Sequence, residues 1–197
     1  MRIVIIGASG HVGAAAVAAL EGRHELIRVG RSTDPSVDLD DPASIERLFQ
    51  QTGEVDAIIC AAGHVPFKPV TQLTREDYVS GFHGKALAQL DVVRLGLPHV
   101  RDGGSITLTT GVTARAAIPT GSAAAMASGA IESFVMAAAG EMPRGIRLNV
   151  ASPTVLASAT HFHDAFPGFP PASDEAVGNL YRRAVEGIET GQTFVLD

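Results

Sequence analysis

The sequence predicts an α/β fold in which one parallel sheet of about seven strands carries helices on both faces. Apolar, strand-like runs alternate with helical patterns along the chain, and neither a linker nor a repeat interrupts them. The first apolar run, Ile3–Ile6, leads at once into glycines 7, 10 and 13 and an alanine-rich helix pattern. A length of 197 residues with 46% hydrophobic residues suits a single domain, 1–197. Together these observations favour a doubly wound Rossmann fold.

Each expected strand is a short apolar run bounded by turn residues. The expected strands are Ile3–Ile6, His24–Val29, Val37–Leu39, Val55–Cys60, Ser105–Thr109, Ile146–Val150 and Thr193–Leu196. Segment 31–36, between the second and third of these, is too short for the usual crossover helix. We therefore expect a trimmed connection at that point.

The expected helices are marked by their N-terminal signals. Asp41 is a good N-cap with Pro42 at the first helical position, and Thr74 and Asp77 have the spacing of a capping box. The expected helices are Ala14–Leu20, Pro42–Gln51, Thr74–Leu97, Gly121–Gly140 and Ser173–Ile188.

The glycine-rich turn after the first strand has the pattern that a dinucleotide needs. Gly7 allows the tight turn, Gly10 lets the backbone approach a pyrophosphate, and Gly13 lets helix and strand pack closely. The phosphates then lie on unpaired N–H groups at the positive end of the helix. A purely structural strand–turn–helix is the alternative.

Composition excludes several classes of protein. The net charge of −6 leaves no basic stripe for nucleic acid. The apolar stretches are too short, or too interrupted by Gly and Pro, for a membrane span. The single cysteine, Cys60, lies in an apolar run and reads as a buried, inert thiol. Because the N-terminus leads straight into a strand without a signal peptide, we expect a cytoplasmic protein.

Five motifs follow one another at characteristic distances. They are Gly7–Gly13 in the spacing G-x-x-G-x-x-G, the pair Asp38-Leu39, the turn Cys60–Gly63, the strand Gly104–Gly111, and the strand and turn Gly145–Pro153. In this order they resemble the motifs of the short-chain dehydrogenases/reductases, and the likeness covers nearly the whole chain. The resemblance implies a Rossmann domain that binds a nicotinamide cofactor and a small-molecule substrate.

The resemblance also implies which residues hold the cofactor. They are Gly7, Ser9, Gly10, His11, Val12, Gly13, Asp38, Leu39, Ala61, Ala62, Gly63, Lys85, Pro153, Thr154 and Val155. No acidic residue follows the second strand until Asp34, whereas Arg31 and Ser32 stand where NAD-preferring sites have an acid. A guanidinium beside a hydroxyl suits the 2′-phosphate of NADP(H), which we therefore expect as cofactor. The alternatives are a solvent-exposed arginine and, for Lys85, a helix-surface charge.

The catalytic tyrosine and lysine of the family are missing from the matching positions of this sequence. Members use Tyr-x-x-x-Lys on the helix after the fifth strand, and the matching positions here are Ala124 and Ser128. Thr110 stands in for the family's serine and His83 for its asparagine, so these two are the candidate catalytic residues. Tyrosine normally supplies general acid–base help, which is then missing. The chain thus resembles a small group of short members that keep the cofactor site and lack these active-site residues.

Other candidates are weaker. His161, His163 and Asp164 lie in a Pro- and Phe-rich loop and give little reason to expect a metal, so we expect none. Segment 162–171 is expected to form a lid over the substrate side. In the family the helices at 74–97 and 121–140 pair across a two-fold axis, which implies a homodimer or homotetramer.

Three functions are open. The first is an NADP(H)-dependent oxidoreductase that works through substituted groups or on a pre-activated substrate. The second is a non-catalytic NADP(H)-binding redox sensor or partner subunit. The third is an enzyme like the nucleotide-sugar or flavin-reductase branch, against which the lack of a larger C-terminal substrate domain counts.

Overall fold

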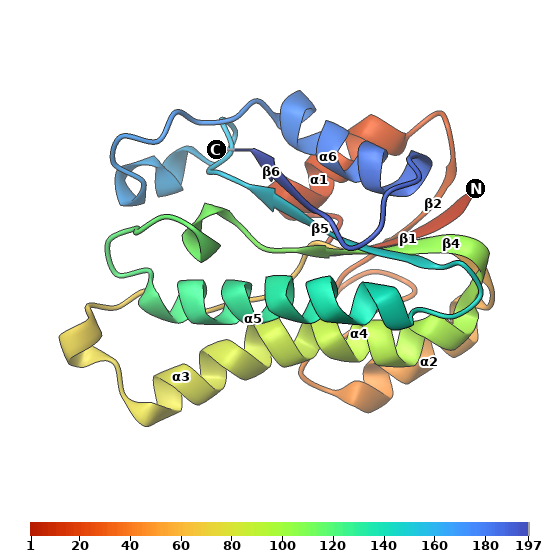
Figure 1. Ribbon diagram of the computed structural model, residues 1–197, viewed down its shortest axis with the longest axis horizontal. Helices are drawn as coiled ribbons and strands as arrows, with labels where there is room; N and C mark the ends of the chain where they lie inside the picture. Colours follow the sequence, from red (N-terminus) through yellow and green to blue (C-terminus); the bar gives the residue numbers. More distant parts are fainter. Residues whose placement is uncertain (197) are drawn as a thin grey trace.

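A single parallel sheet organises the computed structural model, which describes residues 1–196 (Figure 1). Its strands are β1 (Arg2–Ile6), β2 (Glu25–Val29), β3 (Val55–Cys60), β4 (Val100–Thr109), β5 (Arg147–Pro153) and β6 (Thr193–Leu196). They lie in the order β2-β1-β3-β4-β5-β6, and every neighbouring pair is parallel. The expected doubly wound α/β fold is confirmed.

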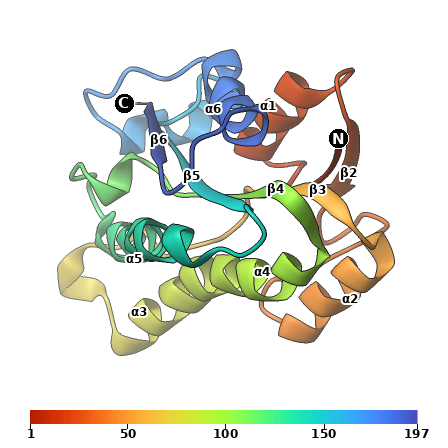
Figure 2. The same ribbon diagram turned by 45° about the vertical axis from the view of Figure 1, so that its right-hand side comes forward.

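Helices cover both faces of this sheet (Figure 2). They are α1 (His11–Leu20), α2 (Pro42–Thr52), α3 (Arg75–Gly81), α4 (Ala88–Gly96), α5 (Ser122–Ala138) and α6 (Asp174–Glu186). Helices α1 and α6 lie on one face, and α2, α4 and α5 lie on the other. Short helical turns complete the chain: η1 (Val70–Gln72), η2 (Phe82–Leu87), η3 (Leu97–His99), η4 (Val112–Ala114), η5 (Ala139–Glu141) and η6 (Thr160–Ala165).

The first strand shows why its run of apolar residues is continuous. Ile3 and Ile5 belong to the core beneath α1 and α6, whereas Val4 and Ile6 belong to the core on the other face. All four are at most 1% exposed. A strand that alternates between two buried faces must be apolar at every position.

The strand order places a crevice at the carboxyl ends of the strands, beside β1. From β1 the chain moves outward to β2, and it then crosses back to β3 on the other side of β1. The connections diverge from β1 at its carboxyl end, and ligands of doubly wound sheets bind at such a switch point. The glycine turn and the end of β3 both lie there.

Among residues 1–196 one expected strand is absent, and the sheet has six strands and not about seven. Segment Val37–Leu39 forms no strand, and only Ser36, directly before it, makes a single parallel bridge, with Gly30. The Thr33 hydroxyl accepts a hydrogen bond from Gly30 N–H at 2.7 Å and lies 2.6 Å from the carbonyl of Pro35. These bonds close a tight turn after β2. The trimmed connection is confirmed, because no helix lies between β2 and α2.

The expected helix Thr74–Leu97 is continuous but not regular. Thr74 and Asp77 form the predicted capping box, with the Asp77 N–H donating to Thr74 Oγ1 at 3.2 Å. The central segment η2 is a π-helix, which adds a residue per hydrogen-bonded turn. Such widened turns frequently occur at functional sites.

Helix α5 is unusually apolar. Segment Ser122–Glu141 is long and apolar enough, by length and composition, to cross a membrane, with a mean hydropathy of 1.3. The expectation that no stretch was long enough is therefore wrong for this segment. In the fold its buried residues Ala127, Ile131 and Val135 pack into the core beside β4 and β5.

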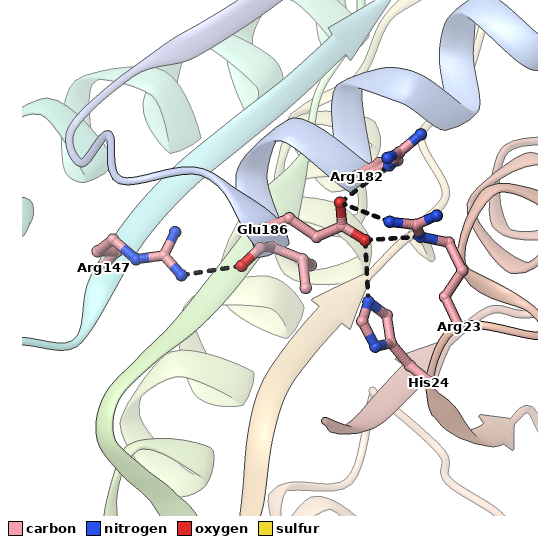
Figure 3. Close-up of polar contacts among 6 residues, drawn as sticks. Arg23, His24, Arg147, Arg182 and Glu186 are labelled. Atoms are coloured by element: carbon pink, nitrogen blue, oxygen red, sulfur yellow. Dashed lines mark hydrogen bonds and ion pairs between the residues drawn. The ribbon is translucent and has the colours of Figure 1, made fainter.

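An ion-pair cluster secures α6 at the edge of the sheet opposite the crevice (Figure 3). The Glu186 carboxylate accepts hydrogen bonds from Arg23 and Arg182, each at 2.9 Å, and lies 3.0 Å from His24 Nε2. These bonds hold the pKa of Glu186 well below its usual value, at about 2. Nearby, the Arg147 guanidinium donates to the last carbonyls of α6. Helix α6 is thus tied to β5 and to the turn before β2.

Candidate active site and cofactor crevice

A crevice of about 490 Å³ opens at the carboxyl ends of β1, β2 and β3. Its lining includes many of the residues expected to hold the cofactor: Gly7, Ser9, Gly10, Arg31, Asp38, Leu39, Ala61, Ala62 and Gly63. It also includes residues that the sequence did not single out: Ile6, Gly30, Val37, Asp40, His64 and Gly84. The glycine turn, the end of β2 and the end of β3 therefore meet around one cavity.

Close backbone packing shapes the glycine turn. Gly7 has a φ of +83°, and a Cβ on Gly13 would lie 2.0 Å from the Gly7 carbonyl oxygen. Gly10 is different, because a Cβ there would meet only the Gly7 oxygen, at 3.5 Å. Gly10 begins α1 without a side-chain cap, and the first turn of α1 carries no acidic residue. The first N–H groups of α1 are thus open to an anion in the crevice.

Charged side chains lie at the end of the crevice beside the carboxyl end of β2. Arg31 is exposed and lines the cavity, and its guanidinium makes no ion pair within residues 1–196. Ser32 is exposed beside it but does not line the cavity. Asp38 accepts a hydrogen bond from Asp40 N–H at 3.1 Å, and this bond orients its carboxylate.

The π-helix η2 packs against the loop that follows β3. The His64 N–H donates to the Gly84 carbonyl at 3.0 Å, and the His64 ring covers Gly84 so closely that a Cβ would lie 2.5 Å from it. On the next residue, the Lys85 side chain passes Gly63, where a Cβ would lie 3.1 Å from Lys85 Cγ. Burial lowers the pKa of Lys85. Burial also raises the pKa of Cys60, at the end of β3, to about 11. Cys60 is thus a buried, neutral thiol, as expected.

A polar network surrounds Thr110, directly after β4. The Thr110 hydroxyl donates to Glu132 Oε1 at 2.7 Å and lies 2.7 Å from Ser152 Oγ. Arg115 binds both partners, at 2.7 Å from Glu132 and 2.9 Å from Ser152. This network was not predicted from the sequence. The sequence signal that could have indicated it is Glu132, the only charged residue of α5.

The positions that match the family's tyrosine and lysine are buried and small. Ala124 is 3% exposed and Ser128 is 1% exposed. The Ser128 hydroxyl lies 3.5 Å from Thr113 Oγ1, and no hydrogen bond joins it to Thr110. Helix α5 contains neither tyrosine nor lysine.

His83 is exposed and borders two grooves. One groove is lined by Leu39, Asp40 and His64, and the other by Phe82 and by Met126 of α5. In the described part of the chain no hydrogen bond links His83 to Thr110, and Thr110 lines neither groove.

The remaining expected cofactor residues lie at the start of α1 and the end of β5. His11 and Val12 open α1. Pro153, Thr154 and Val155 are buried, and the Thr154 hydroxyl is a buried group without a hydrogen-bond partner among residues 1–196.

The stretch just before the segment expected to form a lid contacts the start of α1. The His161 ring lies 5.4 Å from the His11 ring, and Ser158 Oγ lies 3.3 Å from His11 Nδ1. His163 Nε2 lies 2.9 Å from the Leu156 carbonyl, which fixes the helical turn η6. Across residues 1–196, no group of three or more His, Cys, Asp or Glu side chains is arranged to hold a metal ion.

Comparisons with known proteins agree with this geometry. The family model described as enoyl-(acyl carrier protein) reductase matches residues 6–195. The crystal structure of the protein lin1944 from Listeria innocua is 40% identical, with all of both chains covered and a TM-score of 0.98. A small-chain dehydrogenase solved in complex with NADPH is 23% identical, covers 100% of this chain and 96% of its own, and has a TM-score of 0.85.

Curated relatives are longer than this chain. The hydroxynaphthalene reductase arp2 of Aspergillus fumigatus is 28% identical over 152 residues, which are 75% of this chain and 53% of the relative. The chain thus spans about half the length of that relative. Because the family model matches nearly every residue and the motifs meet around one crevice, the chain belongs to the short-chain dehydrogenase/reductase family.

Proposed function

We propose that this protein is an NADP(H)-dependent oxidoreductase that acts on a small carbonyl or alcohol substrate with a reduced set of catalytic groups. The observation that carries the proposal is the crevice itself, which joins the open first turn of α1 to Arg31. A pyrophosphate fits the N–H groups of that turn, and a 2′-phosphate fits an arginine without an internal partner.

The residues present fit a nicotinamide dinucleotide. Gly10 leaves room for phosphate oxygens, because a Cβ there would otherwise occupy the open space beside the turn. Directly after β5, the Thr154 hydroxyl is buried and has no hydrogen-bond partner among residues 1–196, so it could bind the carboxamide group of the nicotinamide ring. When bound, the cofactor supplies or accepts hydride, and the chain's contribution is to position it.

The catalytic contribution of Thr110 and His83 stays a prediction. The Thr110 hydroxyl already donates to Glu132, so its role toward a substrate oxygen is orientation and not proton release. His83 is exposed on η2, next to the crevice-lining Gly84, and its imidazole remains a candidate proton donor.

A titration with both cofactors tests the proposal. A hydrogen bond to a charged group contributes roughly 1.5–3 kcal/mol, so NADPH should bind about 10–100-fold more tightly than NADH. Arg31→Ala should remove this preference. Arg47→Ala is the matched control, because Arg47 is an exposed arginine on α2 that pairs with Asp41 outside the crevice. Equal affinities for the two cofactors in the native protein would refute the NADP(H) assignment.

A second function is favoured by one observation. Helix α5 offers no tyrosine or lysine to a substrate, which suits a non-catalytic NADP(H)-binding sensor or partner subunit. A panel of ketones, aldehydes and secondary alcohols separates the two functions. Tight NADPH binding without turnover of any of them would favour the sensor.

A further inference from the structure

Lys85 is a partly buried cation on η2. Its ammonium makes no hydrogen bond or ion pair within residues 1–196. The chain's other lysine, Lys68, contrasts with it, because that side chain is half-exposed and lies 2.6 Å from Asp77 Oδ1. A charge that is withdrawn from water is normally paired with an opposite charge or a hydrogen-bond acceptor. Lys85 therefore needs a functional explanation.

Two contacts place Lys85 beside the carboxyl ends of the central strands. Its side chain passes Gly63, in the turn directly after β3. One turn further along the same helix, Gln89 bonds both the N–H and the carbonyl of Thr109, each at 2.8 Å. Lys85 precedes Gln89 by four residues and directly follows Gly84, which lines the crevice together with Gly63.

The surroundings of Lys85 favour release of a proton. Burial lowers the pKa of its ammonium, and the titratable side chain that acts on it in the described chain is Cys60. Because the pKa of Cys60 is raised to about 11, that thiol is neutral at neutral pH and gives the ammonium no counter-charge. A lysine with a lowered pKa gives up its proton more readily than an ordinary lysine and is therefore a better general acid.

We propose that Lys85 is the proton donor of the reaction, in place of the tyrosine that the family carries at the position of Ala124. This inference rests on the proposed function and names the group that completes it. The substrate class is a carbonyl compound whose oxygen meets Lys85 Nζ at the end of β3 and β4.

The step balances as follows. With a reduced nicotinamide bound, Lys85 would give one proton from Nζ to the carbonyl oxygen, and the carbonyl carbon would take up hydride, with its electron pair, from the cofactor. The carbonyl π bond breaks, a C–H and an O–H bond form, and the substrate is reduced to an alcohol while the cofactor is oxidised. Neutral Lys85 then regains its proton from water.

Because the chain has only two lysines, NMR of isotope-labelled lysine side chains gives one signal for each, and Lys85→Met identifies them. We expect the Lys85 signal to titrate at lower pH than that of Lys68. We also expect its midpoint to be lower, by on the order of one pH unit, with NADP⁺ than with NADPH, because the oxidised ring carries a positive charge. A midpoint equal to that of Lys68, or one that is the same with both cofactor forms, would overturn the proposal.

Kinetics on any carbonyl substrate found in the panel give the second measurement. Lys85→Met and Lys85→Arg should each lower kcat by about 10²-fold or more, since neither side chain donates a proton at neutral pH. Lys68→Met is the control and should behave as the native protein. Full activity in Lys85→Arg would show that only the positive charge matters, and this would overturn the role as proton donor.

Cofactor binding separates the two hypotheses. If the native protein fails to bind NADPH, the proposed function is wrong. If it binds NADPH and the midpoint of the Lys85 titration is the same with NADP⁺ and NADPH, only the inference about Lys85 is wrong. Circular dichroism and thermal melting of Lys85→Met show whether the variant folds.

Discussion

At the scale of single residues, Gly10 and Gly13 of the same turn have different roles: we expect Gly13 to be needed for packing and Gly10 for cofactor binding. A Cβ on Gly13 would clash with the Gly7 oxygen, whereas a Cβ on Gly10 has room within the protein and faces the crevice. Gly10→Ala should therefore leave the melting temperature nearly unchanged and abolish NADPH binding. Gly13→Ala should lower stability by about 1–3 kcal/mol, because the helix and the turn must separate.

Fluorescence titration with NADPH and thermal melting of both variants measure these effects. Gly140→Ala is a neutral control, since nothing lies within 4 Å of its added Cβ. If Gly10→Ala binds NADPH as the native protein does, the phosphates do not lie on the first turn of α1.

Residue positions on η2 show where sequence reasoning fails. The glycine turn was predictable because strand, turn and helix follow one another in the chain. The sequence predicts one regular helix over 74–97, but the π turn within it changes which side of the helix meets the crevice. The contact of Glu132 with Ser152 joins residues far apart in sequence, and no local pattern encodes it.

At the scale of elements, the end of α6 depends on the Glu186 cluster. The pKa of Glu186 is lowered to about 2 from its ordinary value of 4.5. A carboxylate with a lowered pKa stabilises the fold above its ordinary pKa, and this contribution is lost as pH falls from 4.5 toward 2. Glu186→Gln should therefore reduce stability at pH 7 by about 1 kcal/mol, because the partly exposed pairs are weakened by water.

Urea denaturation at pH 7 and at pH 3 checks this prediction. The difference between Glu186→Gln and the native protein should shrink at the lower pH. Glu141→Gln, at an exposed carboxylate outside any ion pair among residues 1–196, should change stability at neither pH. A Glu186→Gln difference that is the same at both pH values would contradict the assigned role.

The helices and strands could be predicted from local sequence rules, with the exception of segment Val37–Leu39. The caps at Asp41 and Thr74 fixed two helix starts because the side chains bond their own first turns. Segment Val37–Leu39 has the composition of a strand, yet a strand also needs a neighbour. The tight turn at Thr33 prevents it from running alongside β2.

At the scale of the whole molecule, we propose a two-fold homodimer through the face formed by α3, η2 and α5. An apolar groove of about 480 Å³ lies there, and Tyr78, Val79 and Met126 are 37%, 48% and 38% exposed. Exposed apolar patches of this kind mark protein interfaces. Met126→Glu should convert the dimer to monomers, because a charge would be buried at the interface.

Analytical ultracentrifugation at micromolar concentration tests the assembly. Ile188→Glu is the control, because Ile188 is 93% exposed and lies beyond α6, away from this face. A native protein that sediments as a monomer would refute the dimer, and a Met126→Glu variant that stays dimeric would place the interface elsewhere.

The trimmed connection after β2 has a consequence for how molecules of this protein meet one another. It leaves β2 as an outermost strand, whose unpaired N–H and C=O groups are a template for another chain. This strand is only five residues long and carries Glu25 and Arg28, which form ion pairs with Arg2 and Glu21. Short, charged edge strands discourage edge-to-edge aggregation. A chain without the crossover helix thus relies on two surface ion pairs to keep the exposed β2 strand from pairing with a strand of another molecule.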